Sequence, residues 1–535
     1  MTSTRTRWIG LLFISIAISL IIVDSTIVNV AIPSIVDELK INSAQVQWVQ
    51  ESYTLVFAAL LVLFGTMADR IGRRRLLALG VTVFTLASIL AGVSPNGDML
   101  IFARVIQGVG GAMVLPTTLS IINATFRGKD RAIAFAIWGS VIGGMAAVGP
   151  LLGGWLTADF SWRWAFGVNV PFGILVVVGV LFTIAESRDR SAGQLDVVGA
   201  LLSVLAAGSL VFGLIEGRSY GWWLATDKAA FGDWNWPLTL SPIPLFFALS
   251  ITSGVLFVLW ANRRRRLGKS TMIALDLFSI PSFRNGNLVA MVVSLGELGV
   301  LFVLPMWMQN VLGFDAFGAG LLLLALAVGS FLASGMVSGL SKSMSPIAIV
   351  RLGIILEIAG VVAIGVVLNP HTSWLALAPA LFVYGIGIGL TSAQVTSVVL
   401  AEVPVEQSGQ ASGTQSTARQ IGSALGIAIL GTILFSSLGS GLGARLDTQT
   451  LPSPVQDKFL NLVVDSAGAA IPGLGDNEKT ADVAKEARIA FSDAARLSAY
   501  SAAGFLVIGW FATLSLGERN RSGTRSVARS EDVTA

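Results

Sequence analysis

Long apolar runs alternate with short polar connections over nearly the whole chain. Each run holds about 20 or more residues, which is the length that an α-helix needs to cross the hydrocarbon core of a bilayer. Glycine, proline and charged residues gather in the connections, where they end the helices. The pattern predicts fourteen membrane helices, at residues 8–32, 44–67, 75–94, 98–124, 132–157, 164–185, 196–215, 242–261, 287–308, 316–340, 346–368, 374–401, 414–437 and 497–516.

The composition agrees with a chain that crosses a membrane many times. Of the 535 residues, 54% are hydrophobic and only 12% are charged, and the mean hydropathy is +0.77. A soluble domain carries roughly 25% charged residues. The first run is too long for the core of a signal peptide and contains Asp24, so we expect a retained helix. The predicted fold class is all-α integral membrane.

The positions of the lysines and arginines indicate the orientation. With the N-terminus placed inside, most basic residues of the short loops fall on the cytoplasmic side, as the positive-inside rule requires. Many of the outer ones lie in one long loop, 438–496, where the rule is weak. Fourteen helices with both termini cytoplasmic satisfy this distribution. Twelve helices are the alternative, but removing any pair of runs breaks the alternation of charge.

The histidine and cysteine content excludes several kinds of chemistry. The chain has no Cys, which excludes disulfides, thiolate metal sites and cysteine catalysis. Its single histidine, His371, falls in a predicted outer loop, so an imidazole relay inside the membrane is also excluded. The glycine-rich stretch 108–111 has no strand before it and is not a phosphate loop. We expect no catalytic residues, no metal, no cofactor and no nucleic acid, and energy that comes from an ion gradient.

The connection at 65–75 is short and highly charged. Its arginines cannot enter lipid at low cost, and Gly72 can adopt a positive φ and make the turn. Taken alone, the stretch is equally well explained as a positive-inside anchor with a turn. Its spacing resembles the helix 2–3 loop signature of the major facilitator superfamily, whose positions match Gly65, Asp69, Arg70, Gly72, Arg73 and Arg74.

Further stretches resemble the fourteen-helix drug:proton antiporter branch of that superfamily. They are 24–33, 104–112, 149–154, 162–171 and 417–426. The third of them resembles the antiporter motif at Gly149, Pro150, Gly153 and Gly154, although Met145 stands where that motif usually has a glycine. The resemblance implies a kink and close helix packing there that favour exchange over uniport. Ordinary helix packing is the alternative.

The resemblance also implies a major facilitator fold of two six-helix bundles plus two inserted helices. The expected domains are 1–190 for the first bundle, 191–270 for the inserted helices, 271–520 for the second bundle and 521–535 for a cytoplasmic tail. A degraded counterpart of the signature loop at 339–346 agrees with two diverged halves.

Two outer segments stand apart from the helices. The tryptophan-rich segment 217–242 suits an interfacial belt at the outer membrane surface. Within the outer loop 438–496, apolar residues at helical spacing over 478–496 predict an amphipathic helix that lies on that surface.

Charged residues within the apolar runs are the candidate coupling site. Asp24 and Arg104 lie at comparable depths in the outer half of their helices, so they can approach each other directly or through water. By resemblance Arg104 belongs to a proton-linked motif, and a purely structural ion pair is the alternative. Glu297 lies mid-span with no basic neighbour in its own helix, so desolvation favours its protonated form. We expect Glu297 to bind protons or cations.

Four more charged residues lie within or next to the apolar runs. Glu51 enters the second helix from the outside and is either a coupling carboxylate or an interfacial one. Arg419, near the inner third of its helix, serves either helix packing or as a counter-charge. Glu357 lies in a helix whose repeat position is usually peripheral, so we expect a structural role. By resemblance, Asp69 faces a helix N-terminus of the other half and braces the two bundles.

Together these features predict a proton-coupled antiporter that exports small-molecule drugs, lipophilic cations among them, by alternating access. It is expected to be a multi-pass monomer of the bacterial cytoplasmic membrane, with drugs, protons and membrane lipid as its partners. A dedicated exporter of a single metabolite or self-made antibiotic is the alternative within transporters. A membrane enzyme or sensor is disfavoured because the loops hold no clustered histidine, cysteine or paired acidic residues.

Overall fold

Backbone groups in lipid must be satisfied within their own segment, so apolar runs of this length fold as helices. The computed structural model shows such helices and describes residues 4–41, 43–188, 196–226, 229–231, 234–447 and 452–516. The predicted tail, 521–535, lies outside the described residues. Several helices begin at a side chain that accepts a hydrogen bond from the first turn, such as Asn96, Asp315 and Ser345.

The first bundle consists of helices in the predicted order. They are α1 (Thr4–Leu39), α2 (Ser43–Ile71), α3 (Arg73–Gly92), α4 (Gly97–Thr125), α5 (Gly128–Asp159), the short α6 (Trp164–Gly167) and α7 (Asn169–Thr183). The predicted run 164–185 is thus divided between α6 and α7. Within this bundle α4 packs against α2 and α3, while α1 packs against α5 and α7.

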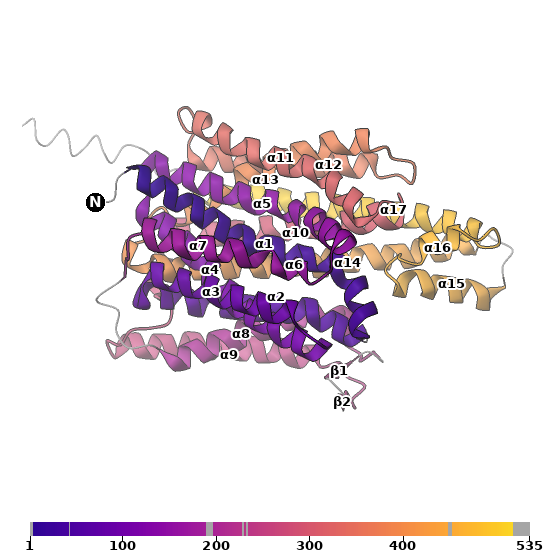
Figure 1. The fold of residues 1–535 in the computed structure, drawn as a ribbon, viewed down its shortest axis with the longest axis horizontal. Helices are drawn as coiled ribbons and strands as arrows, with labels where there is room; N and C mark the ends of the chain where they lie inside the picture. The colour runs from indigo at the N-terminus through magenta and orange to yellow at the C-terminus, as the bar shows by residue number, and fades with distance from the viewer. Residues whose placement is uncertain are drawn as a thin grey trace, which may run out of the picture.

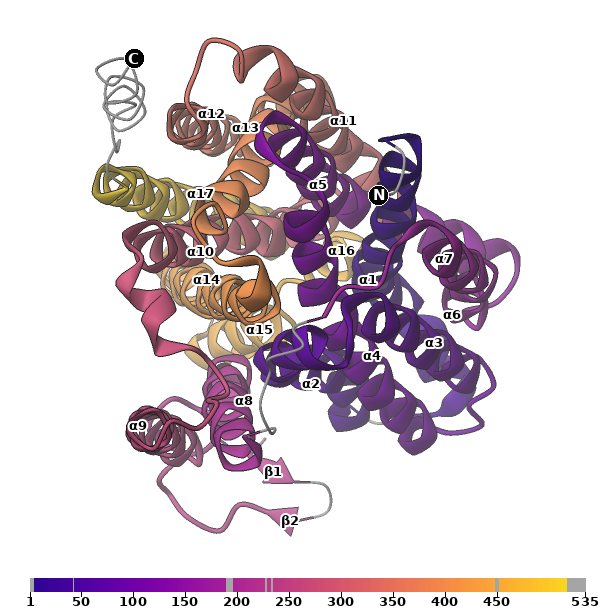
Figure 2. The ribbon, with the colours of Figure 1, turned by 90° about the vertical axis from the view of Figure 1, so that its left-hand side faces the viewer.

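Two helices and a small hairpin follow the first bundle. Helices α8 (Val197–Tyr220) and α9 (Ile243–Arg266) pack against each other, and α8 also packs against α2. Strands β1 (Ala230–Phe231) and β2 (Trp234–Asn235) form an antiparallel pair between them. Figure 2 shows α8, α9 and the hairpin together at one edge of the molecule. The predicted interfacial belt at 217–242 is the end of α8 and this hairpin, and its place at a membrane surface stays a prediction.

The second bundle begins after the 3-10 turn η1 (Leu275–Ser279). Its helices are α10 (Pro281–Asn310), α11 (Ala316–Leu340), α12 (Pro346–Val367), α13 (Trp374–Val399), α14 (Ser408–Leu446) and α17 (Ala481–Ala512), and the 3-10 turns η2 (Val405–Gln407) and η3 (Thr513–Ser515) precede α14 and follow α17. Helices α10 and α17 both pack against α14, which places α14 inside the bundle.

The predicted outer loop 438–496 is wrong over most of its length. Helix α14 continues to Leu446, α15 (Ser453–Asp465) and α16 (Ile471–Gly475) follow, and α17 already begins at Ala481. The expected surface helix is therefore the first part of α17 and not a separate element. Its apolar positions, such as Ala487 and Phe491, are buried because α14 and α16 pack against α17. This face is covered by protein and does not lie on lipid.

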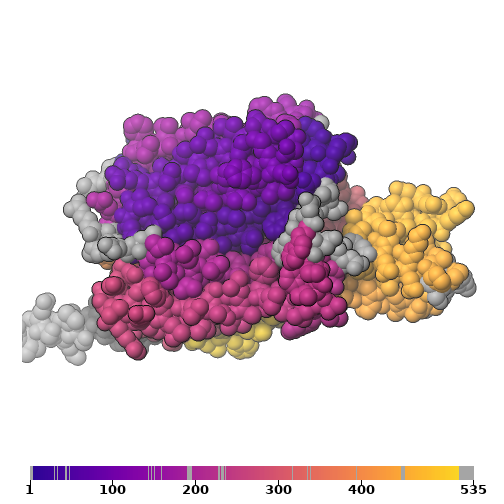
Figure 3. Space-filling model, turned by 90° about the horizontal axis from the view of Figure 1, so that it is seen from below, coloured from indigo at the N-terminus to yellow at the C-terminus, as the bar shows by residue number. Residues whose placement is uncertain are grey.

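We call residues 438–447 and 452–496 the outer protrusion. Figures 1 and 3 show it extending from the end of the molecule opposite the N-terminus. Ion pairs from Arg445 to Glu486 (3.1 Å) and Asp493 (3.0 Å) hold α14 to α17 there. Asn310 of α10 donates a hydrogen bond to the carbonyl of Ala467 at 3.1 Å. The protrusion is thus an ordered continuation of the second bundle.

Thirteen helices of the described part of the chain are long and apolar enough to cross a membrane. They coincide with thirteen of the fourteen predicted spans. The remaining span, 132–157, lies within α5, a helix of 32 residues in which some side chains fall outside the description. The all-helical membrane fold is therefore confirmed, while the count of fourteen and the cytoplasmic location of both termini stay predictions.

The two bundles meet along two sets of helices. Helix α5 packs against α11 and α13, and α2 packs against α14, as the view in Figure 2 shows. Hydrogen bonds between the bundles gather at the end of the molecule where α2 ends and α14 begins. Asn123 donates to the Ser408 hydroxyl at 2.9 Å there, and Gln394 donates to the Ala132 carbonyl at 3.4 Å. This is the predicted cytoplasmic end.

Candidate functional site

Asp24 is the centre of a buried polar network in the first bundle. Its carboxylate is fully buried and accepts hydrogen bonds from Arg104, from Gln107 at 3.0 Å and from Asn169 at 2.9 Å. Gln107 and Asn169 also donate to the Ser88 hydroxyl, at 2.8 and 3.1 Å. Helices α1, α3, α4 and α7 each supply part of this network. The structure confirms that Asp24 and Arg104 meet directly.

Arg104 is held in place by hydrogen bonds and by an aromatic ring. Besides Asp24, it donates to the carbonyl of Val49 at 3.1 Å and to Gln107 at 2.9 Å. Its guanidinium also lies over the ring of Tyr53, 4.3 Å from the ring centroid. A buried charge is costly unless it is paired and hydrogen-bonded. These contacts meet that requirement and leave the pair little freedom to rearrange without a change in the charge of Asp24.

Only part of this network could be predicted from the sequence. Gln107 lies within the stretch 104–112 and Asn169 within the stretch 162–171, and both stretches resemble the antiporter branch. Ser88 was missed, because one hydroxyl in an apolar helix carries no distinctive signal in the sequence.

Glu297 is the matching acid in the second bundle. It is buried in α10, and its Oε1 accepts a hydrogen bond from Ser392 at 3.2 Å. Arg419 of α14 lies 3.7 Å from Glu297 Oε2 and donates to the Ser392 hydroxyl at 3.1 Å. The structure therefore supplies the basic partner that the helix of Glu297 lacks. Of the two alternatives for Arg419, this geometry favours the counter-charge.

The two carboxylate–arginine pairs differ in tightness. Asp24 and Arg104 form a direct hydrogen bond, and the side chain of Arg104 is 2% exposed. Glu297 and Arg419 are 3.7 Å apart, and the side chain of Arg419 is 17% exposed. The looser pair can accommodate a further charged group more easily than the tight one.

Glu51 lies near the contact between the first bundle and the end of α8. It lies in α2 and is close enough to Tyr220, at the end of α8, to raise the pKa of that phenol, after the larger effects of burial and of Glu216. Its environment is thus the contact between the first bundle and the inserted helices. This position favours the interfacial alternative over a place beside Asp24.

Asp69 joins the two bundles at the end of α2. Its carboxylate is buried and accepts hydrogen bonds from the backbone N–H of Gly409 at 2.8 Å and of Gln410 at 2.9 Å, both in the first turn of α14. Arg73 donates to Asp69 Oδ1 at 2.7 Å and also to the carbonyl of Val405. The expectation that Asp69 faces a helix N-terminus of the other half is confirmed.

The rest of the signature loop makes its contacts within the first bundle. The Glu186 carboxylate accepts from the backbone N–H of Arg74 at 3.1 Å and of Arg75 at 3.2 Å, which satisfies the first turn of α3. Gly72 has φ 116° at the start of α3, a conformation that residues with a side chain rarely adopt. Arg70 is half-buried at the end of α2.

Glycines allow the bundles to approach closely at this end. A Cβ atom on Gly65 would lie 2.5 Å from the Gly409 carbonyl oxygen and 2.7 Å from Gly413 Cα, so the backbones of α2 and α14 are in contact. A larger residue at position 65 would separate the helices and lengthen the hydrogen bonds of Asp69.

The stretch 149–154, which resembles the antiporter motif, lies against α1 close to Asp24. A Cβ atom on Gly149 would overlap the Thr26 side chain, and one on Gly153 would lie 2.9 Å from Ile27 Cγ1. Gly154 faces Phe317 of α11 in the other bundle. Pro150 falls within α5, but its side chain lies outside the description, so the expected kink stays a prediction. The motif positions α5 between Asp24's helix and the second bundle.

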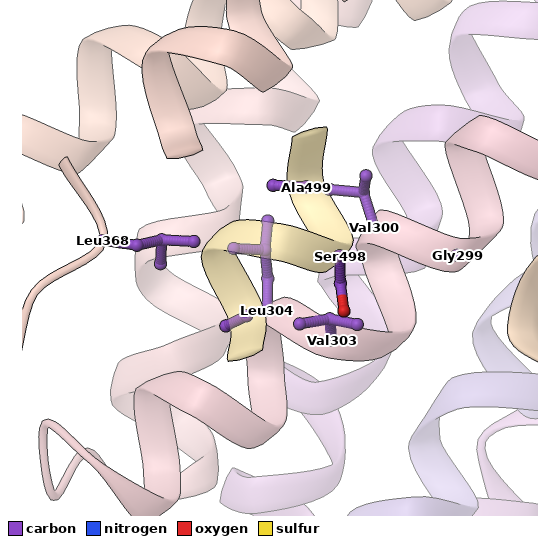
Figure 4. Close-up of a pocket in the computed structure, with 8 residues that line it drawn as sticks. Gly299, Val300, Val303, Leu304, Leu368, Ser498 and Ala499 are labelled. Atoms are coloured by element: carbon purple, nitrogen blue, oxygen red, sulfur yellow. The ribbon is translucent and has the colours of Figure 1, made fainter. Parts of the chain in front are cut away.

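A small apolar pocket lies between α10 and α17 of the second bundle. Figure 4 shows Val300, Val303 and Leu304 of α10 on one side, and Ser498 and Ala499 of α17 on the other. The Ser498 hydroxyl donates within its own helix to the Ala494 carbonyl at 3.0 Å. The lining therefore offers no free charge to a ligand, and none of the candidate site residues lines it.

The chain is similar to known transporters along most of its length. The family model described as Major Facilitator Superfamily matches residues 14–427. Over 413 residues the chain is 32% identical to the multidrug efflux pump LfrA of Mycolicibacterium smegmatis, and the match covers 77% of this chain and 78% of that protein. It is also 32% identical over 418 residues to the probable actinorhodin transporter of Streptomyces coelicolor, with 76% and 69% covered.

A solved structure supports the fold. The crystal structure of the human organic anion transporter MFSD10 superposes with a TM-score of 0.57 at 13% identity, covering 95% of this chain and 98% of that one. The family match includes the signature loop, Asp24, Arg104, Glu297 and Arg419. With its many apolar helices, the chain therefore belongs to the Major Facilitator Superfamily and is a multi-pass protein of the cell membrane.

Proposed function

We propose that the protein is a proton-coupled antiporter that exports drugs, lipophilic cations among them, by alternating access between its two bundles. The observation that carries the proposal is the fully buried Asp24, held by Arg104 and two side-chain amides. The similarity to a protein named as a multidrug efflux pump supports drugs as the cargo.

Asp24 would act by exchanging its partner Arg104 for a proton. An ionised carboxylate in a protein interior costs several kcal/mol unless a cation compensates it. While Arg104 is in place, the ionised form is stable. Binding of a proton removes the charge of Asp24, weakens its bond to Arg104 and frees the guanidinium. Because α1 packs against α5 at Gly149 and Gly153, a shift of Asp24 is passed to a helix at the bundle interface.

The pair of Glu297 and Arg419 would face the cargo. Its greater distance and partial exposure allow a positive group to compete with Arg419 for the carboxylate. A lipophilic cation that binds there would compensate Glu297 in place of the arginine or of a proton. This competition couples cation binding to proton release in the second bundle.

The Asp69 contact would close the cytoplasmic face when the cargo site is open to the outside. Asp69 and Arg73 bind the start of α14 and the turn before it, so the closed face is stabilised by charge-assisted hydrogen bonds. Opening towards the cytoplasm must break all of them together. Such a contact makes the two faces open in turn.

To build a steep concentration gradient of an exported cation, the protein must exchange more than one proton for each cation. A potential of 100 mV is worth about 2.3 kcal/mol per charge moved. Exchange of one proton for one monovalent cation moves no net charge and uses only the pH difference. Exchange of two protons for one cation moves one net charge across the membrane. Since about 1.4 kcal/mol corresponds to a tenfold gradient, the potential then raises the attainable cation gradient more than tenfold. Titratable carboxylates in both bundles meet this need.

The proposal is tested by reconstituting the protein in vesicles with an imposed pH gradient and measuring export of a cationic dye and of a neutral drug. Asp24→Asn preserves the shape of the side chain and removes its charge, so it should abolish transport of both. Asp482→Asn, an exposed acid in the outer protrusion, serves as the matched control and should transport normally. Proton-driven export by Asp24→Asn would refute the proposal.

A dedicated exporter of one metabolite or self-made antibiotic is the second candidate. The similarity to a protein named as a probable actinorhodin transporter favours it. A drug-susceptibility panel on cells with and without the protein separates the two. Resistance to several unrelated drugs supports the broad exporter, and resistance to one compound alone supports the dedicated one.

A further inference from the structure

Glu357 is a buried acid that the proposed function does not use. It lies in α12 and is fully buried. The Thr391 hydroxyl is the single hydrogen-bond donor that approaches its carboxyl among the described residues, and it does so without good hydrogen-bond geometry. Asp24, by contrast, accepts from Arg104 and two amides. A buried acid with a single, poorly placed donor is a group that has to be explained.

The carboxyl of Glu357 is directed into the bundle. Gly353 and Gly360 lie one turn before and after it on α12 and contact Thr391 and Tyr384 of α13. A Cβ atom on Gly387 of α13 would lie 2.7 Å from Glu357 Cγ. The two helices thus pack backbone to backbone around this side chain. The outward face of α12 is formed instead by exposed apolar residues such as Ile355, Val362 and Val366.

Helix α13 connects Glu357 to Glu297. Thr391, which interacts with Glu357, is followed at once by Ser392, which donates to Glu297 at 3.2 Å. Tyr384 of the same helix donates its hydroxyl to the backbone carbonyl of Glu297 at 3.2 Å. The hydroxyl of Thr391 therefore lies beside Glu357, and that of its neighbour Ser392 lies beside Glu297.

The charges around Glu357 do not balance two ionised acids. Glu297 of α10, Arg419 of α14 and Tyr384 of α13 are the titratable groups that interact with it. From α17, Tyr500 lies against Gly365 of α12, about two turns beyond Glu357. Arg419 is the single cation of this set and pairs with Glu297. When two carboxylates share one site, one of them takes up a proton.

We propose that Glu357 binds a proton in this conformation and exchanges it with Glu297, so that the second bundle holds two carboxyls that share one proton. The proposal rests on the proposed function as far as transport is concerned. In the exchange, the proton leaves Glu357 and neutralises the carboxylate of Glu297. Glu357 becomes the anion, and Arg419 changes its counter-charge from Glu297 to Glu357. A cation cargo that binds at Glu297 in place of the shared proton then releases that proton.

Infrared spectroscopy of the purified protein in lipid tests the proton directly, without transport. The carbonyl stretch of a protonated carboxyl should be present at neutral pH, and Glu357→Gln should remove it. Glu297→Gln should cause that band to disappear at a lower pH than in the wild type, because the competing negative charge is gone. Glu478→Gln, an exposed acid in the outer protrusion, is the control and should leave the band unchanged.

A spectrum that is unchanged by Glu357→Gln would overturn the proposal, as would a band whose titration does not respond to Glu297→Gln. If Glu357→Gln does not fold, Glu297→Gln still tests the proposal, because that variant keeps Glu357. These results are independent of the cargo, so they hold even if the protein proves not to be a drug antiporter. In vesicles, Glu357→Gln should lower the number of protons exchanged per cation by one, and an unchanged number would contradict the role in transport.

Discussion

At the scale of single residues, Arg104 determines the stability of the first bundle's polar network. Arg104→Ala would leave Asp24 buried without a cation, and breaking a buried pair in this way costs about 3–5 kcal/mol. We expect a lower thermal unfolding temperature and a loss of proton-coupled efflux. Arg104→Lys keeps the charge but loses the planar set of donors that reaches Asp24, Gln107 and Val49, so its loss should be partial.

A double variant separates stability from coupling at this pair. Asp24→Asn combined with Arg104→Gln removes both charges, so it should unfold closer to the wild type than Arg104→Ala does. Its proton-coupled efflux should remain absent. If Arg104→Ala exports normally in vesicles with a pH gradient, Arg104 has only a structural role.

Glu38 makes a contact outside the membrane whose contribution to stability depends on pH. It accepts hydrogen bonds from Arg163 and from Trp162, both at 2.7 Å, and these lower its pKa below the ordinary value for a glutamate. Since the pKa is lower in the folded protein, the contact stabilises the fold above the ordinary pKa. This stabilisation is lost as the pH falls through the lowered value. The carboxylate is about half exposed, so we expect less than about 1 kcal/mol.

Unfolding temperatures of the wild type and Glu38→Gln over a range of pH check this contact. The wild type should be more stable at neutral pH, and the difference should vanish in acid. A difference that increases on acidification would show that the carboxylate is not stabilised by these donors.

At the scale of helices, Asp69 fixes the start of α14 to the end of α2. Asp69 accepts hydrogen bonds from Gly409, Gln410 and Arg73. Asp69→Asn removes the negative charge and replaces one of the two accepting oxygens with an NH₂ group, which cannot accept. Each hydrogen bond to a charged group contributes about 1.5–3 kcal/mol. We expect Asp69→Asn to abolish export while leaving expression and drug binding largely intact. Glu186→Gln, which weakens the cap of α3 but no contact between bundles, is the matched control and should export far better.

Measurement of efflux together with equilibrium drug binding decides this point. Normal efflux from well-expressed Asp69→Asn would rule out the proposed closure of the cytoplasmic face. Equal loss in Asp69→Asn and Glu186→Gln would mean that the loop matters for folding of the first bundle and not for the contact with α14.

The helices also show how far the sequence predicts this structure and where it stops. Asp24 and Arg104 were predicted to meet because the depth of each in its apolar run can be counted. Glu297 and Arg419 lie on helices far apart in sequence, and only the packing of α10 against α14 brings them together. The continuation of α14 to Leu446 was missed because 438–446 is rich in glycine and polar residues. Its helix is stabilised by contacts with α17, such as the ion pairs of Arg445, which no local pattern reveals.

At the scale of the whole molecule, the proposed function gives the two carboxylate–arginine pairs different roles, one in each bundle. Glu297→Gln removes the charge that would attract a cation but leaves Asp24 and the Asp69 contact intact. We therefore expect loss of cation export, most severe for divalent cations, with neutral drugs largely spared. Parallel efflux assays with a divalent cation, a monovalent cation and a neutral drug check this. Equal loss for neutral and cationic drugs would make Glu297 a coupling residue for all cargo.

Helix α14 makes the outer protrusion a lever. Its 39 residues form one rod of about 58 Å, anchored at its first turn to Asp69 and ending in the protrusion. Each degree of tilt about that anchor moves the far end by about 1 Å. Because the chain has no cysteine, Asp457→Cys on the exposed surface of α15 accepts a single label. With the predicted orientation, such a label would report, from the medium outside the cell, the opening of a contact at the opposite end of the molecule.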